Sequence, residues 1–181
     1  MIKSDIRWNI LKEFFEYPDK GFYVRELARR IKVNHTSVSQ HLKILVKEGL
    51  LKIEKEEIYP KYKVAASQKF FYIKQFYNLE KIRESFIIEV LQHQYDFPTI
   101  VIFGSYAQGI DNKNSDIDLF VLTNIKEKFK GKIEEYEKKL NREISLHFFT
   151  KKEFEEAKKK NKELINNIAN GIVVGGQLEI L

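Results

Sequence analysis

The sequence predicts an α+β protein with a front module of three helices and two short strands and a back module with a mixed sheet flanked by helices. Apolar residues recur at helical spacing through residues 1–48. Runs of β-branched and aromatic residues, typical of strands, follow at residues 99–103 and 116–122. Charge divides the chain in the same way. Residues 1–66 hold 14 lysines and arginines against 9 acidic residues (net +5), whereas residues 67–181 hold 18 against 17 (net +1).

The front module is expected to begin with a helix that Ser4 caps and that ends near Tyr17. Polar residues then form a turn between a second and a third helix, and Gly49 closes the third. Two strands joined by a charged loop complete the module. The expected bounds are residues 25–31 and 35–48 for the second and third helices, and 50–54 and 60–64 for the strands.

Residues 33–45, Val-Asn-His-Thr-Ser-Val-Ser-Gln-His-Leu-Lys-Ile-Leu, and residues 48–51, Glu-Gly-Leu-Leu, resemble the winged helix-turn-helix of ArsR- and MarR-like regulators. The resemblance implies that the third helix enters the major groove of double-stranded DNA and that a wing meets the phosphates. The implied DNA-binding residues are His35, Thr36, Ser37, Ser39, Gln40 and Lys43 on the helix and Lys61 and Lys63 on the wing. A winged helix used only for protein contacts or dimerisation is the alternative.

A helical linker, residues 67–93, is predicted between the front module, residues 1–66, and the back module, residues 94–181. We expect one helix that packs on the front module and a second that packs on the sheet. The first helix either contributes to the interface of a homodimer, which we expect, or belongs to the core of a single chain. The linker is too apolar for a flexible tether, because it carries Phe70, Phe71, Ile73, Phe76, Tyr77, Leu79 and Ile82.

The centre of the back module is a predicted buried strand, Thr99–Phe103, that stops at Gly104. A glycine at this point lets the backbone come close to a ligand. If Ser105 opens a short helix, its hydroxyl and the N–H groups of the first turn would form an anion site. Asp116 and Asp118 then lie on one side of a second strand, with Cα atoms roughly 6–7 Å apart. Two carboxylates so close repel each other, which favours Mg²⁺ bound together with substrate phosphates.

Gly104-Ser105, ten intervening residues and Asp116-Ile117-Asp118 resemble the signature of the minimal nucleotidyltransferases in the DNA polymerase β-like superfamily. The resemblance implies a Mg²⁺-dependent enzyme that moves a nucleoside monophosphate, with AMP from ATP as the expected case, to an acceptor hydroxyl. Such enzymes are often paired with a helical HEPN protein, so a toxin–antitoxin partner is a candidate acceptor. The implied nucleotide-binding residues are Gly104, Ser105 and Ser115, and the implied catalytic and metal-binding residues are Asp116, Asp118 and Glu143.

Glu143 is the candidate third carboxylate, because alternation along residues 143–149 places it on one face with Ser145 and His147. We expect it to bind the metal ion or to take the proton of the acceptor hydroxyl. An ordinary glutamate at the start of a strand is the alternative. Gln108 departs from the family pattern, in which arginine often stands at this position. This departure favours a second hypothesis, a DNA-binding regulator whose back domain senses nucleotide or is an inactive scaffold.

The remaining sequence predicts further helices at residues 126–140 and 151–170, the latter capped by Thr150, and a terminal strand within 171–181. With 43% hydrophobic and 32% charged residues among 181, the composition is that of a soluble globular protein. Neither a secretory signal nor a membrane span is visible, so we expect a cytoplasmic protein without a membrane partner. The chain has no cysteine, which excludes disulfides and thiolate zinc sites.

Overall fold

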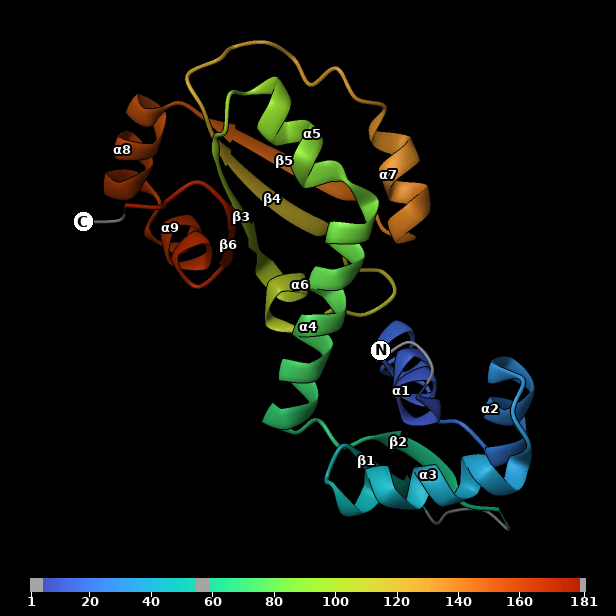
Figure 1. Cartoon of the computed structure of the whole chain (residues 1–181). Coiled ribbons are helices and arrows are strands. Elements are labelled where there is room, and N and C mark those ends of the chain that lie inside the picture. The colour runs from blue at the N-terminus through green and yellow to red at the C-terminus, as the bar shows by residue number, and fades with distance from the viewer. Residues whose placement is uncertain (1–4, 55–58, 180–181) are drawn as a thin grey trace. The chain divides into compact units, whose positions relative to one another are not determined.

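The computed structural model describes residues 5–54 and 59–179 and divides into two compact units, Met1–Tyr77 and Asn78–Leu181 (Figure 1). The predicted α+β class is confirmed. The boundary between the units falls within the helix α4 (Gln68–Ser85). The predicted linker is therefore helical, and its residues belong in part to each unit.

The first unit has the predicted order of three helices followed by two strands. Its predicted cap, Ser4, lies outside the described residues. The N-cap of the first helix is Asp5, whose carboxylate accepts a hydrogen bond from the Arg7 N–H at 2.8 Å. The elements are α1 (Ile6–Glu16), α2 (Val24–Ile31), α3 (His35–Lys47), β1 (Leu51–Glu54) and β2 (Lys61–Val64).

A tight turn between α2 and α3 fixes the direction of α3. Lys32 adopts a left-handed conformation (φ 56°) at the end of α2. Asn34 then caps α3, because its side chain accepts a hydrogen bond from the Ser37 N–H at 2.8 Å. One face of α3 is thereby buried in a core shared with α1, and the opposite face is left to solvent. The buried residues of α3 are Val38, Leu42 and Leu45.

The two strands of the first unit form an antiparallel pair in which Leu51 lies opposite Val64. Phe22 adds a single antiparallel bridge to Tyr62 of β2. Both rings of this bridge are buried in the core of the unit. The wing is thus anchored at its base by packing and not only by its own hydrogen bonds.

The second unit is built on a mixed sheet with the strand order β5-β4-β3-β6. β3 runs antiparallel to β4 and β6, whereas β4 and β5 run parallel. The predicted mixed sheet and the predicted terminal strand are confirmed. The strands are β3 (Thr99–Phe103), β4 (Ile117–Leu122), β5 (Ile144–Phe149) and β6 (Ile172–Gly175).

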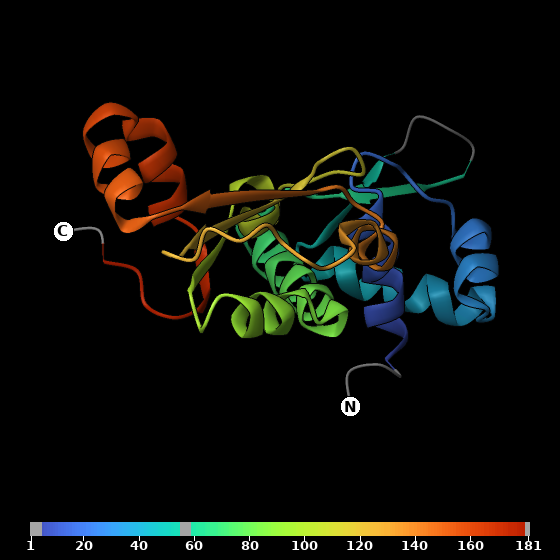
Figure 2. The same cartoon turned by 90° about the horizontal axis from the view of Figure 1, so that it is seen from above.

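Helices cover both faces of this sheet, as Figures 1 and 2 show. α5 (Ile87–Gln94) and α7 (Ile133–Leu140) pack on the face that carries Ile102 and Leu119. α8 (Lys151–Lys160) and α9 (Lys162–Ala169) pack on the other face, which carries Phe103 and Phe120. The short helix α6 (Gly104–Gln108) follows directly after β3.

The predicted helix 126–140 is wrong in its first half, since α7 begins only at Ile133. The segment before α7 has no regular secondary structure, and the side chain of Gln94 is hydrogen-bonded to its backbone. Its amide donates a hydrogen bond to the Lys128 carbonyl at 2.7 Å, and its carbonyl accepts one from the Lys130 N–H at 2.9 Å. These bonds occupy backbone groups that a helix would have paired internally.

The predicted helix 151–170 is in fact two helices, α8 and α9. The break is at Asn161, which has φ −129° and ψ 73° and caps α9 by accepting a hydrogen bond from the Leu164 N–H. An asparagine side chain competes for backbone groups in this way and favours caps over helix interiors. The predicted cap Thr150 is confirmed, and it forms a reciprocal capping box with Glu153. Among the described residues, no helix is long and apolar enough to cross a membrane.

Candidate functional site

The two predicted aspartates lie at the start of β4, in the middle of the sheet. Asp118 pairs with Phe103 of β3 on one side and with Ser145 of β5 on the other. Asp116 precedes the strand by one residue and is exposed, whereas the side chain of Asp118 is only 23% exposed. Since residues two apart on a strand face the same side, both carboxylates leave the sheet on the face that carries Phe103 and Phe120.

Gly104 lies directly against the carboxylate of Asp118. It has φ +71°, and a Cβ added at this position would be 2.6 Å from Asp118 Oδ2. Any L-amino acid other than glycine would therefore be strained in its backbone and would push the carboxylate away. The sequence predicted a close approach at Gly104 to a ligand, and the structure reveals a close approach to the acidic residue itself.

Two side chains of β5 contact the aspartates. Ser145 Oγ donates a hydrogen bond to Asp116 Oδ2 at 3.1 Å. His147 Nε2 lies 3.2 Å from Asp118 Oδ1, and its ring centroid is 5.3 Å from that of Phe103. Each carboxylate therefore has one polar partner on the neighbouring strand that restricts its orientation. The alternation of β5 predicted the face of Ser145 and His147, but their contacts depend on the register between the two strands.

Burial raises the pKa of Asp118, and the negative charge of Asp116 raises it further. The hydrogen bond with His147 and the charge of His147 act in the opposite direction. The anionic form of Asp118 is thus disfavoured in the protein alone. A cation bound between the two aspartates would reverse this balance, because an opposite charge nearby stabilises a carboxylate.

Magnesium fits this pair of carboxylates. The ion prefers oxygen ligands and commonly takes one or two carboxylates together with substrate phosphates. The described residues contain no group of three or more histidine, aspartate or glutamate side chains that could hold a metal ion. The exposed Glu143 accordingly does not join Asp116 and Asp118 in a three-carboxylate group. The donor set suits an ion that arrives with a nucleotide better than an ion held by protein alone.

The other predicted nucleotide-binding residues flank the aspartates. Ser105 is the second residue of α6 and is half-buried, and the exposed Gln108 ends that helix. Ser115 closes the loop before β4, because its hydroxyl accepts a hydrogen bond from the Asn112 N–H at 3.0 Å. This bond gives Ser115 a structural role, and its contact with a nucleotide stays a prediction.

A buried polar network behind the site was not predicted from the sequence. Asn78 donates hydrogen bonds to the carbonyl of Tyr106 at 2.9 Å and to Asp111 Oδ1 at 2.8 Å. The Arg142 guanidinium lies 3.9 Å from Asp111 Oδ2, and both side chains are almost fully buried. The network ties α6 and the following loop to α4 and to the turn between α7 and β5. No motif marks these residues, since Asn78 lies in the segment predicted to be a linker.

The predicted DNA-binding residues lie on the solvent face of α3 and on the wing. His35, Thr36, Gln40 and Lys43 are exposed, and Ser37 and Ser39 are half-buried. Both wing lysines already interact with other side chains of the same unit. Lys63 pairs with Glu54 at 2.9 Å, and the Lys61 ammonium lies over the Tyr23 ring at 5.5 Å from its centroid.

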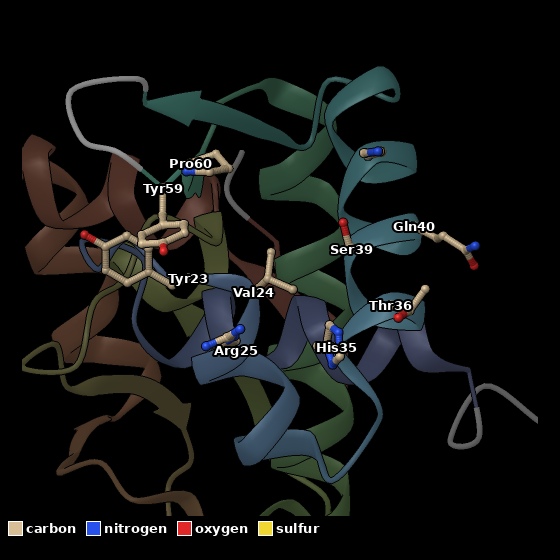
Figure 3. A pocket seen from close by; sticks show the side chains of 10 residues that line it. Tyr23, Val24, Arg25, His35, Thr36, Ser39, Gln40, Tyr59 and Pro60 are labelled. Carbon is tan, nitrogen blue, oxygen red and sulfur yellow. The ribbon is translucent and has the colours of Figure 1, made fainter.

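A groove of about 650 Å³ runs beside the solvent face of α3. Figure 3 shows α3 side chains along one side of it and the rings of Tyr23, Tyr59 and Pro60 on the other. Val24 and Arg25, at the start of α2, also line it. The groove was not predicted, because it depends on where the wing lies relative to α2 and α3.

Comparison with known proteins agrees with this geometry. Residues 85–177 match the family model described as polymerase beta, nucleotidyltransferase. Residues 4–52 match the model described as bacterial regulatory protein, arsR family. The resemblance of each module is therefore confirmed. No curated protein and no solved structure matches the chain.

Proposed function

The chain belongs to the polymerase beta nucleotidyltransferase family, and we propose that its second unit transfers a nucleoside monophosphate from a triphosphate to a hydroxyl while its first unit binds DNA. The observation that carries the proposal is the pair of carboxylates on β4, with Gly104 so close that a Cβ would be 2.6 Å from Asp118 Oδ2. ATP is the proposed donor, as the family resemblance implies.

In the proposed reaction, Asp116 and Asp118 hold magnesium that accompanies the nucleotide. When bound, the ion neutralises charge on the phosphates and on the departing pyrophosphate. The acceptor oxygen forms a bond with the α-phosphorus, and the bond from that phosphorus to the oxygen bridging to the β-phosphate breaks. Gly104, Ser105 and Ser115 are the proposed contacts to the nucleotide. Catalysis of this type rests mainly on positioning and charge neutralisation.

Within this proposal, β5 supplies the residues that position the aspartates, and Glu143, directly before β5, takes the proton. Ser145 and His147 restrain Asp116 and Asp118 through the bonds at 3.1 and 3.2 Å. Glu143 is the proposed proton acceptor for the attacking hydroxyl. The proposal is supported by its backbone carbonyl, which accepts a hydrogen bond at 2.9 Å from the N–H of Ile117, the residue after Asp116. The proposed acceptor is a tyrosine hydroxyl of a helical HEPN-type partner, as in a toxin–antitoxin pair.

Two measurements on the full-length protein test the transferase. The first is incubation with Mg²⁺ and ATP labelled at the α-phosphate, with and without the product of a neighbouring toxin-like gene. The second is calorimetric binding of ATP with and without Mg²⁺. The control is the double variant Asp116→Asn/Asp118→Asn, which keeps side-chain shape and removes both charges. Mg²⁺-dependent binding with transfer of label supports the proposal, and the absence of any Mg²⁺-dependent binding overturns it.

A second candidate function is a DNA-binding regulator whose second unit senses nucleotide without turnover. The observation that favours it is the uncharged Ser145 at the β5 position paired with Asp118. Exposed Gln108, where relatives often carry arginine, agrees with it. ATP binding that requires Mg²⁺ but transfers no label to any acceptor, and that changes the affinity for DNA, would select this candidate over the transferase.

DNA binding by the first unit is proposed to use the solvent face of α3, with a homodimer reading two half-sites. The basic excess of this module, +5 over residues 1–66, supports attraction to phosphates. Affinity for duplex DNA from the gene's own upstream region should fall steeply with salt. Lys43→Ala should reduce both the affinity for DNA and the salt dependence of DNA binding. Light scattering, which measures the mass in solution, tests the proposed homodimer.

A further inference from the structure

The groove beside α3 has two chemically different walls. One wall is aromatic and apolar, with Tyr23, Tyr59 and Pro60. Tyr59 is 72% exposed, so its ring is offered to solvent and is not part of the core. The facing wall is formed by α3, where the Ser39 hydroxyl supplies a polar group, and the amide of Gln40, which also lines the groove, points away from the tyrosines (Figure 3). A ligand that contacts both walls must have flat, apolar faces and hydrogen-bonding groups at its edge.

The charged residues of the groove are cationic. Among the described residues, Arg25 and Lys43 line it, and no acidic residue does. In the part of the chain that the structure describes, neither cation has a carboxylate within ion-pair distance. Other basic residues of the same unit are neutralised, as Lys20 is by Glu26 at 2.6 Å. The groove is therefore suited to an anionic occupant.

A perfectly paired duplex does not satisfy this combination. Its major groove presents base edges, while the faces of the bases are covered by stacking. Aromatic side chains instead gain most from bases that are unstacked, and such contacts are worth roughly 1–3 kcal/mol per base. The volume of about 650 Å³ also lies within the range of roughly 300–1,000 Å³ found for pockets that enclose a small organic group.

We propose that this groove binds an unpaired nucleotide of a DNA strand. The base lies against the tyrosine wall with its edge toward Ser39, and its phosphate is held by Arg25 and Lys43. The inference rests on the proposed DNA binding by the first unit and extends it from duplex recognition to recognition of an unpaired base. It is independent of any activity of the second unit.

Fluorescence anisotropy with the full-length protein tests the inference on three DNAs of related sequence: a perfect duplex, the same duplex with one bulged nucleotide, and a single strand. The key variant is Tyr59→Ala, which should fold normally because the side chain is exposed. Tyr59→Phe keeps the ring. Tyr72→Ala removes a tyrosine that is also exposed but does not line the groove.

We expect the bulged DNA to bind more tightly than the perfect duplex. Tyr59→Ala should weaken binding of the bulged DNA about 5- to 160-fold, as loss of one stacked base predicts, and should leave the perfect duplex nearly unchanged. Tyr59→Phe and Tyr72→Ala should behave as wild type. Equal effects of Tyr59→Ala on both DNAs, or none on either, would overturn the inference. Tighter binding of single-stranded RNA than of the same DNA would assign the groove to RNA instead. Failure to bind any DNA would refute the underlying DNA-binding proposal.

Discussion

Replacing Gly104 with alanine tests whether the site requires the Asp118 carboxylate at its present position, because the variant keeps this side chain but displaces it. The added Cβ would be 2.6 Å from Asp118 Oδ2, and φ at this residue is +71°. Ordinary contact begins near 3.4 Å, so the carboxylate must move by about 0.8 Å. The oxygen is the end of a side chain, and it can move without disturbing the sheet. The variant should therefore fold, with Asp118 displaced from its position beside Asp116.

The expected magnitudes follow from the two effects separately. A left-handed backbone costs a residue with a Cβ roughly 1–2 kcal/mol, which lowers the melting temperature of a domain of this size by roughly 4–8 °C per kcal/mol. A displacement near 1 Å in a catalytic constellation can cost about 100-fold in rate. We expect a modest loss of stability together with a loss of transfer activity of that order and weaker Mg²⁺-dependent binding of ATP.

Gly49→Ala is the matched control. Gly49 has φ +73°, and a Cβ there would meet nothing within 4 Å. The control carries the same backbone strain without moving any catalytic group, so transfer activity should stay at the wild-type level. The assays are calorimetric melting of each variant and the transfer of α-labelled phosphate measured below the melting temperature. Full activity in Gly104→Ala, alongside an inactive Asp118→Ala, would refute the reasoning that the location of this carboxylate matters.

Three further predictions concern single side chains. Asp118→Asn should raise the melting temperature at pH 7 while abolishing transfer, since the folded protein raises the pKa of Asp118 and so holds its anion at a cost. The stability gain should vanish below pH about 4, where the unfolded carboxyl is protonated as well, and a gain that persists there in calorimetric scans would contradict the explanation. Ser145→Ala removes one hydrogen bond to Asp116, and calorimetry should find Mg²⁺-dependent ATP binding weakened about 2- to 10-fold, with no change in melting temperature. Asn34→Ala removes the cap of α3 and should cost the first unit about 1 kcal/mol. The single tryptophan, Trp8, lies in that unit and reports its unfolding by fluorescence, while transfer activity below the melting temperature should not change.

The sequence predicted local geometry well wherever alternation or capping decides it. β3 coincides with the predicted strand Thr99–Phe103, and Asp116 and Asp118 share a face as the period of two requires. Thr150 is the N-cap of α8, as its residue type and its position before the helix predicted. These features depend only on neighbours along the chain, and the sequence contains all of the information needed to derive them.

Features that depend on register between strands could not be derived in this way. The pairing of Asp118 with Ser145 sets which β5 side chains reach the aspartates, and no property of either strand alone specifies it. The same holds for the buried contact of Asn78 with Asp111, which joins residues 33 apart in the chain. The non-helical segment before α7 is a further case, because the distant Gln94 pairs with two of its backbone groups despite its helical periodicity.

The composition of the site bears on how metal and nucleotide enter. Two carboxylates with no third acidic or histidine ligand among the described residues leave most coordination positions of a magnesium ion unfilled by protein. Asp118 is also disfavoured as an anion by its burial and by Asp116. Affinity for Mg²⁺ alone should therefore be weak, and affinity for Mg²⁺ with ATP much stronger, because the phosphates supply the missing oxygens. This coupling is common to the transferase and the sensor. What distinguishes them is proton removal from an acceptor, the task that we propose for the exposed Glu143. A Glu143→Gln variant that binds ATP normally but transfers nothing would place the chain with the enzymes, whereas wild-type protein that binds ATP without transferring it would place it with the sensors.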